Sequence, residues 1–354
     1  EVVEAEPDLV AIDGFSEFAL LSETDTEWNG SFGEQLSDPV AIELYQTLKE
    51  KLMDDGYYRE EPFAPLRVEI PLKNRLMYTS ATCQEVYARA SMTANEAWWA
   101  MKQDYPQLYW AYGVSMGICT YENASGDGRV SEIDYEIGDG DQYYENCSTG
   151  TTGDETLRAY QEAVARIVEQ ARKEAGDDRY KLVKYFHDYL CEELSYDNEA
   201  AGADKSNLSQ YLYAHTSVPA FIGYKDKGKK VVCEGYAKAL KVLCDKVGIP
   251  CVLVSGMGGI GDSKGAHMWN YVQMEDKQWY LVDATWDDQG MEIYDTYFLA
   301  GSQTKGFGAS GNVGEEHIAE SVLTYTDPDF TFAYPVLAEN AYKYAPKTPL
   351  TDEK

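Results

Sequence analysis

The pattern of apolar and polar positions predicts helices in both halves of the chain. Apolar residues recur every three or four positions, which is the spacing of a helix with one buried face. The segments with this spacing are 38–53, 83–103, 154–176, 178–194 and 233–247. Aspartates at the starts of the third and fourth segments can cap those helices, and Gly248 ends the last one.

Short runs of β-branched and aromatic residues between turn residues predict strands. These runs lie at 62–80, where prolines enclose a short strand, and at 111–122, 131–137 and 250–256. A hairpin follows, in which HMWNYVQM and WYLVDATW flank the polar turn EDKQ. Helices therefore precede antiparallel strands in the second half, an order that favours an α+β fold over a doubly wound parallel sheet.

These elements divide the chain into four expected regions. Residues 1–35 are predicted to be an irregular acidic leader, and residues 36–150 an N-terminal α+β region of unknown role. Residues 151–310 are the expected core, and residues 311–354 an extension that packs on it.

The composition is that of an acidic globular protein. The 354 residues include 30 Lys and Arg against 61 Asp and Glu, which gives a formal net charge of −31. Such a charge repels a phosphate backbone, so nucleic acid is not an expected partner. No apolar run approaches the roughly 20 residues of a transmembrane helix. The first residues lack both a Met and a signal-peptide core, so we expect a processed protein that is secreted or at the cell surface.

Metal and disulfide chemistry find little support in the sequence. The seven cysteines include no CxxC pair, the four histidines form no HExxH motif, and GDGD at 138–141 lacks the spacing of an EF-hand loop. We therefore expect no metal and no cofactor. Cys191, Cys244 and Cys251 lie in apolar contexts that suit packed free thiols better than a structural protein held together by disulfides.

Cys233, His267 and Asp283 are the candidates for chemistry. Cys233 is at the first turn of a predicted helix, where unpaired N–H groups favour the thiolate, although burial in a core is the commoner role of a cysteine. His267 is eight residues before Glu275 and Asp283 is eight residues after it, so a turn near Glu275 brings them to adjacent strands. Nucleophile, base and orienting carboxylate form a recognisable set, but the side-chain faces depend on the turn register.

The segments that carry these residues resemble the transglutaminase-like superfamily, in the form found in bacterial secreted or surface proteins. The resemblance rests on VVCEGYAKALKVLCDKVGIPCVLVSG, GAHMWNYVQ and QWYLVDATWDD, and is strongest over 180–300 within 85–300. It implies a papain-like, transglutaminase-like core, in which the helix of the nucleophile packs on an antiparallel sheet, with an N-terminal α/β extension.

The resemblance also implies a cysteine-dependent acyl transfer on peptide or protein amide bonds. Cys233 would attack the carbonyl, His267 would move the proton, and Asp283 would orient the imidazole. The thioester would pass to water or to a primary amine, and we favour a protease or amidase over crosslinking. The substrate would be a peptide or protein, such as a cell-wall or surface protein. The alternative is a non-catalytic surface or cell-wall binding module that keeps the fold.

The other histidines and the nearby aromatic residues leave alternatives open. His215 is a candidate second donor to the oxyanion, although an ordinary loop histidine is the favoured interpretation. His187 is expected to be a packed core residue and His317 a surface residue. The aromatic residues beside the triad motifs either line the site or belong to the core; they are Tyr236, Trp269 and Trp286.

Overall fold

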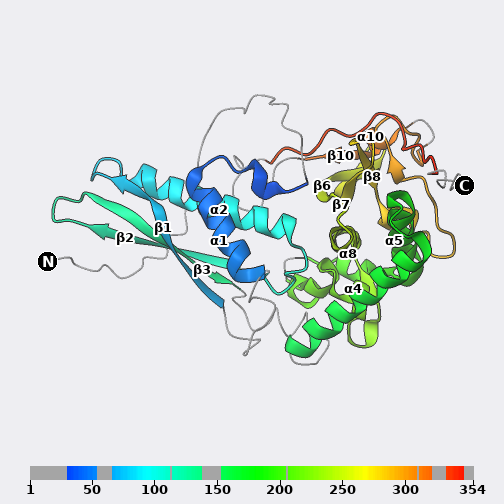
Figure 1. The fold of residues 1–354 in the computed structure, drawn as a ribbon, viewed down its shortest axis with the longest axis horizontal. Helices are drawn as coiled ribbons and strands as arrows, with labels where there is room; N and C mark the ends of the chain where they lie inside the picture. Colours follow the sequence, from blue (N-terminus) through cyan, green and yellow to red (C-terminus); the bar gives the residue numbers. More distant parts are fainter. Residues whose placement is uncertain are drawn as a thin grey trace, which may run out of the picture.

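The structure, a computed structural model, describes residues 30–53, 66–111, 114–137, 153–204, 206–308, 311–320 and 332–346. Figure 1 shows two regions along the long axis of the molecule, an N-terminal sheet with two helices and a larger core. The segment GDGD at 138–141 lies outside the described residues.

The N-terminal region is a three-stranded antiparallel sheet with the order β1-β3-β2. Two helices, α1 and α2, pack against each other and on this sheet. The elements are η1 (Phe32–Gln35), α1 (Pro39–Met53), β1 (Leu66–Tyr78), α2 (Cys83–Asp104), β2 (Val114–Glu122) and β3 (Gly128–Ile137). The predicted helices and strands of this part are confirmed, and β1 is a long strand of 13 residues rather than a short one.

The end of the predicted leader is packed rather than irregular. Phe32 is buried, and the carboxylate of Asp104 accepts hydrogen bonds from Ser31 Oγ at 2.7 Å and from the backbone N–H of Phe32 and Gly33 at 2.8 and 2.9 Å. Four residues here form a 3-10 helix, and one buried carboxylate satisfies the first two of its backbone donors. The remaining leader, residues 1–29, lies outside the described residues.

The core consists of helices packed on a five-stranded antiparallel sheet with the order β10-β6-β7-β8-β9. The main helices are α4 (Gly153–Ala175), α5 (Arg179–Glu193) and α8 (Cys233–Lys246). The strands are β6 (Cys251–Ile260), β7 (Ser263–Gln273), β8 (Trp279–Val282), β9 (Phe298–Ala300) and β10 (His317–Ala319). Helix α8 packs on β6 and β7, so the expected α+β architecture is confirmed.

Short elements connect these helices and strands. They are β4 (Ser195–Tyr196), α6 (Asn198–Ala201), η2 (Leu208–Gln210), η3 (Leu212–His215), α7 (Val218–Ile222), η4 (Lys225–Lys227), β5 (Lys230–Val231), α9 (Ala284–Asp287) and α10 (Val313–Glu316). Asp178, at the start of the fourth predicted helix, caps α5 as expected by accepting a hydrogen bond from Lys181 N.

The predicted hairpin is confirmed with shifted strand ends. Strand β7 begins at Ser263, so His267 lies within the strand rather than at its start. Strand β8 ends at Val282, so Asp283 is not a strand residue: it caps α9, and its side chain accepts hydrogen bonds from the backbone of Thr285 and Trp286. A carboxylate gains two backbone donors in this position, whereas it is disfavoured inside a strand.

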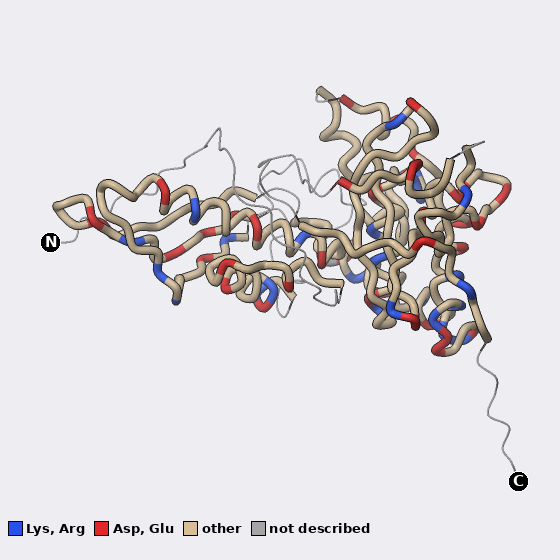
Figure 2. The backbone as a smooth tube through the Cα atoms, turned by 90° about the horizontal axis from the view of Figure 1, so that it is seen from above, with Lys and Arg blue, Asp and Glu red and all other residues tan. Residues whose placement is uncertain are grey.

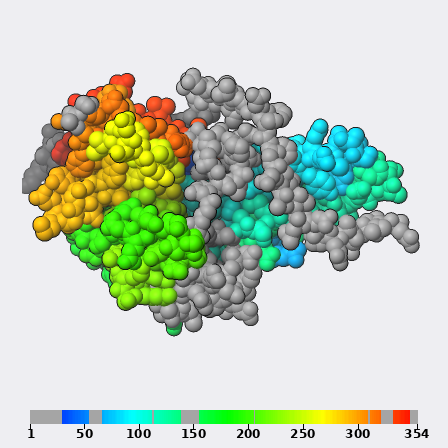
Figure 3. Space-filling model, turned by 180° about the vertical axis from the view of Figure 1, so that it is seen from behind, coloured from blue at the N-terminus to red at the C-terminus, as the bar shows by residue number. Residues whose placement is uncertain are grey.

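Charge is spread over both regions. Figure 2 shows acidic and basic segments along the N-terminal region and the core alike. Figure 3 shows the molecule from behind, where the surface of α4 and α5 (green) lies below that of the sheet (yellow to orange). Among the described residues, the helices are each too short or too polar to cross a membrane.

Candidate active site

Cys233 is the first residue of α8 and is half-buried. The helix starts here because Val231 and Val232 bury their side chains just before it, while Gly235 fits a crowded first turn. A Cβ on Gly235 would lie 2.5 Å from Val231 Cβ and 2.9 Å from Ala214 O. The glycine of the C-x-G-Y-A motif therefore lets the cysteine end of α8 pack closely against the segment before it.

Strand β7, which carries His267, is tied to α8 by a buried amide. Asn270 Nδ2 donates to Ala237 O in α8 at 3.0 Å and to Val252 O in β6 at 3.4 Å. The Trp-Asn that follows His267 thus has a physical reason, since the asparagine fixes the strand of the imidazole relative to the helix of the thiol.

Helix α9, which follows Asp283, is tied to α8 by a tyrosine. Tyr236 is buried, and its hydroxyl donates to Asp288 Oδ2 at 2.6 Å. Of the two roles considered for Tyr236, its burial favours the core, and its hydrogen bond links the helix of Cys233 to the helix of Asp283.

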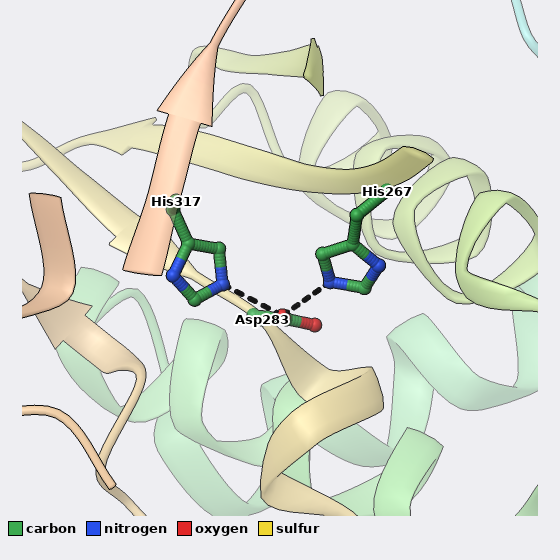
Figure 4. Close-up of side chains that lie close together, drawn as sticks. All are labelled: His267, Asp283 and His317. Carbon is green, nitrogen blue, oxygen red and sulfur yellow. Dashed lines mark hydrogen bonds and ion pairs between the residues drawn. The ribbon is translucent and has the colours of Figure 1, made fainter. Parts of the chain in front are cut away.

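His267 and Asp283 are in direct contact. His267 Nε2 donates to Asp283 Oδ2 at 2.7 Å, and the two side chains are 8% and 1% exposed (Figure 4). Burial alone would lower the pKa of His267. The Asp283 carboxylate and the Cys233 thiol outweigh burial and raise this pKa to about 10. Burial raises the pKa of Asp283, but His267 and His317 hold it well below its usual value.

The Cys233 thiol acts on the same imidazole, since its hydrogen bond and its charge both help to raise the pKa of His267. Because Nε2 of His267 is bound to Asp283, its Nδ1 is the nitrogen that remains for the thiol. Tyr196 is a further neighbour: burial and then the charge of Cys233 raise the pKa of its phenol to about 12. Sequence reasoning missed Tyr196 because it stands in a two-residue strand without periodicity.

Two tryptophans stack on the imidazole. The rings of Trp269 and Trp286 lie 5.8 and 5.1 Å from the ring of His267, at interplanar angles of 28° and 23°. Trp269 is buried, whereas Trp286 is half-buried in α9. They restrict the orientation of the imidazole and keep water from its faces.

His215 lies at the end of η3, beside the first turn of α8. Its Nδ1 donates to Glu234 Oε2 at 2.9 Å, and Lys238 Nζ donates to Glu234 Oε1 at 2.6 Å and to His215 O at 2.9 Å. Burial raises the pKa of Glu234, but Lys238 and His215 bring it well below its usual value. His215 is thus held by the residue after Cys233, and its role as an oxyanion donor stays a prediction.

The expectation of a surface position for His317 is wrong. His317 is buried in β10, and its Nε2 donates to Asp283 Oδ2 at 3.0 Å (Figure 4). Its ring contacts those of Trp286 at 4.5 Å, Tyr297 at 4.9 Å and Trp269 at 5.0 Å. The stretch VGEEHIAE looks polar, but Glu316 and His317 are buried and make hydrogen bonds inside the protein, while Glu315 and Glu320 are exposed.

A second set of Cys, His and Asp lies beneath α9. His187 Nε2 is 3.2 Å from Asp287 Oδ2, and Cys191 Sγ is 3.8 Å from the same nitrogen. Burial lowers the pKa of His187, but Asp188 and Asp287 raise it well above its usual value. The Cys191 thiol donates to Ala284 O at 3.4 Å, and burial raises its pKa. The prediction of a packed core histidine is confirmed.

The cysteines in the described part of the chain are all free, and Cys191, Cys244 and Cys251 are buried as expected. Three side-chain groups in that part have the geometry of metal ligands. In the group around Asp283, two imidazole N–H groups meet one carboxylate oxygen at hydrogen-bond distance. The groups at Cys119 and at Asp188 include carboxylates paired with Arg67 and Lys184 respectively, so hydrogen bonds and ion pairs account for all three.

Comparison with solved structures gives distant likenesses. A structure described as a TGase is 16% identical with a TM-score of 0.32, over 80% of this chain and 68% of that one. The periplasmic domain of TgpA from Pseudomonas aeruginosa is 15% identical with a TM-score of 0.26, over 50% of this chain and 66% of that domain. A provisionally assigned cysteine protease from Cytophaga hutchinsonii is 16% identical with a TM-score of 0.25, over 49% of this chain and 65% of that one.

No curated protein matches the chain significantly. A family model does match it, over residues 164–284, and that model describes the transglutaminase-like superfamily. The match includes Cys233, His267 and Asp283 and ends just before Trp286. The resemblance seen in the sequence is therefore confirmed: residues 164–284 are a domain of the transglutaminase-like superfamily.

Proposed function

We propose that the protein is a cysteine-dependent acyl-transfer enzyme that acts on peptide or protein amide bonds. The observation that carries this proposal is the buried hydrogen bond from His267 to Asp283, on an imidazole whose pKa the Cys233 thiol also raises. An imidazole held between a carboxylate and a thiol at a helix start is the arrangement that a nucleophilic thiolate requires.

The first half-reaction would form a thioester. At pH 7 an imidazole with a pKa of about 10 is protonated, so His267 holds the proton that the leaving amine needs. The sulfur attacks the carbonyl carbon and forms a C–S bond. The C–N bond breaks as His267 gives its proton to the leaving amine, and Asp283 stabilises the imidazolium until then.

The developing oxyanion would be stabilised at the start of α8. As the first residue of that helix, Cys233 has a backbone N–H without an acceptor inside the helix. Such a donor in a partly desolvated site is worth several kcal/mol to a tetrahedral intermediate. We propose His215 as the second donor, since hydrogen bonds to Glu234 and Lys238 hold it beside the same turn.

The second half-reaction would release the acyl group. Water or a primary amine attacks the thioester carbonyl, His267 takes its proton, and the thiolate leaves. We favour water, and hence a protease or amidase, with a peptide or surface protein as the substrate. Secretion or a cell-surface location, and the lack of a nucleic-acid partner, stay predictions.

Incubation with casein tests the proposal. Two readings run in parallel, the release of new amino termini and the incorporation of a fluorescent primary amine, and Cys233→Ala serves as the control. We expect one of the two activities in the wild type and neither in the variant. If wild type and Cys233→Ala gave the same result in both assays, the proposal would be contradicted and the non-catalytic binding module would be favoured.

A further inference from the structure

The carboxylate of Asp283 is held by more groups than an orienting role alone requires. Its Oδ1 accepts the backbone N–H of Thr285 at 3.0 Å and of Trp286 at 3.3 Å. Its Oδ2 accepts His267 Nε2 at 2.7 Å and His317 Nε2 at 3.0 Å. Asp283 therefore has four donors from three elements, α9, β7 and β10, and two of these donors are imidazoles.

The place of His317 is built into the sheet. His317 pairs with Gly258 of β6, and a Cβ on Gly258 would lie 2.8 Å from His267 Cβ. A Cβ on Gly256 would lie 2.0 Å from Ile318 O. Because side chains at these two positions would displace the histidine or the strand, the glycines of β6 let both imidazoles reach one carboxylate.

Strand β10 has its own anchor, independent of His317. The buried Glu316 carboxylate accepts the backbone N–H of Gly308 at 2.7 Å and of Phe307 at 3.3 Å, and the hydroxyl of Tyr297. Since Glu316 secures this segment, the hydrogen bond of His317 is not needed to hold the strand on the sheet.

We propose that His317 is a positioning residue for the acyl transfer, which keeps Asp283 anionic and oriented toward His267 by donating to the oxygen that both histidines share. This inference rests on the proposed function. The positive charge of His267 is lost when it gives its proton to the leaving amine, and the N–H of His317 continues to hold the carboxylate at that moment. His317 lies outside the matched residues 164–284, so the C-terminal part of the chain completes the site.

Two substitutions separate the donor from the ring. His317→Phe keeps an aromatic ring against Trp269 and Trp286 but removes the donor. His317→Gln loses the ring but places an amide N–H close to the position of Nε2. Glu316→Gln is the matched control, because it weakens the anchor of β10 and leaves the hydrogen bond to Asp283 in place.

The measurements are kcat/KM on casein against pH and the labelling of Cys233 by iodoacetamide. The groups that can titrate around His317 are His267, Asp283, Tyr297 and Glu316. Loss of a hydrogen bond to a charged group predicts about a 10- to 100-fold lower kcat/KM in His317→Phe. The acid limb of the pH profile, where kcat/KM falls as the pH is lowered, should also move to higher pH, since Asp283 binds a proton more readily without this donor.

We expect His317→Gln to restore most of the activity and the wild-type acid limb, and Glu316→Gln to lower Tm without moving that limb. An unmoved limb in His317→Phe, or no recovery in His317→Gln, would overturn the inference. Failure of the proposed function looks different: labelling of wild-type Cys233 would then be as slow as in His267→Ala. If His317→Phe does not fold, His317→Leu replaces it as the variant without a donor, and equal acid limbs in His317→Leu and His317→Gln would contradict the inference.

Discussion

The two ends of helix α9 each hold a Cys–His–Asp set, and the sets differ in burial and in partners. Asp283, before the helix, binds His267 beside a half-buried Cys233. Asp287, at its end, binds His187 beside Cys191, which is 3% exposed. Only the first thiol begins a helix; the second lies within α5 and donates to a carbonyl.

This difference teaches that residue type alone does not define a nucleophile. Burial raises the pKa of the Cys191 thiol, and its imidazole partner is bound by carboxylates on both ring nitrogens. In the other set one ring nitrogen is bound by a carboxylate and the other remains for the thiol. The set at His187 instead ties α5 to α9 and so supports the position of Asp283.

The largest expected effect separates the two thiols. Cys233→Ala should lower activity on casein by at least about 1000-fold, because it removes the nucleophile. Cys191→Ala should leave kcat/KM within about threefold and lower stability by about 1 kcal/mol, because it opens a small cavity. Steady-state kinetics and thermal melts measure both. Equal losses of activity would show that the buried set is the reactive one or that both act together.

The two carboxylates should separate in the same way. Asp283→Asn should lower kcat by about 100-fold or more, because the amide no longer stabilises the imidazolium. Asp287→Asn should lower stability by roughly 2 kcal/mol, since it leaves the buried imidazole of His187 with Asp188 but without its second carboxylate partner. Activity is expressed per folded protein, with the folded fraction taken from the thermal melt, so that unfolded protein is not counted. A loss of kcat in Asp287→Asn as large as in Asp283→Asn would contradict the comparison.

The pKa of His267 predicts a pH window in stability. An imidazole raised from about 6.5 when unfolded to about 10 when folded stabilises the protein fully below pH 6.5. That contribution is lost as the pH rises toward 10. The difference in Tm between wild type and His267→Gln should therefore be largest near pH 6 and shrink by several degrees by pH 10. A difference that stays constant or grows with pH would contradict the assigned charge.

The smallest expected effect concerns the link between α8 and α9. Tyr236→Phe removes the hydrogen bond to Asp288 and should cost about 1 kcal/mol of stability, because the carboxylate can regain water. Activity should fall only a few-fold, since Asn270 still ties β7 to α8. Thermal melts and casein kinetics measure both quantities, and Tyr87→Phe, which removes a hydroxyl that donates to Thr120 in the N-terminal region, serves as the control. A loss above about 100-fold would mean that Tyr236 acts in the chemistry itself.

Much of the fold could be predicted because its elements are local. The stripe of 38–53, the cap at Asp178 and the hairpin turn after Met274 each follow from residues close in sequence. The strand ends were less predictable, since Asp283 ends β8 by capping a helix of only four residues. Such a helix has no periodicity to read.

In the candidate site, too, some contacts could be predicted from local sequence and others could not. The contact of His267 with Asp283 follows from one turn, because the two residues are eight positions on either side of Glu275 and the hairpin register is centred one residue later, on Asp276. The contact of His317 with Asp283 does not follow from local sequence, because it depends on the pairing of β10 with β6. His317 pairs with Gly258 and Ala319 with Gly256, so 58 to 62 residues of chain lie between the paired positions. Buried polar residues outside any apolar pattern carry no local signal, and Glu316 and His317 are of this kind.

The rate at which iodoacetamide labels Cys233 across pH, in wild type and in His267→Ala, tests the central claim most directly. Cys191 in the same molecules is the internal reference. We predict fast labelling of Cys233 below pH 7, slow labelling of Cys191, and at least a tenfold fall at Cys233 in the variant. Labelling of Cys233 that rises only above about pH 8, as for an ordinary thiol, and that ignores His267 would contradict the account.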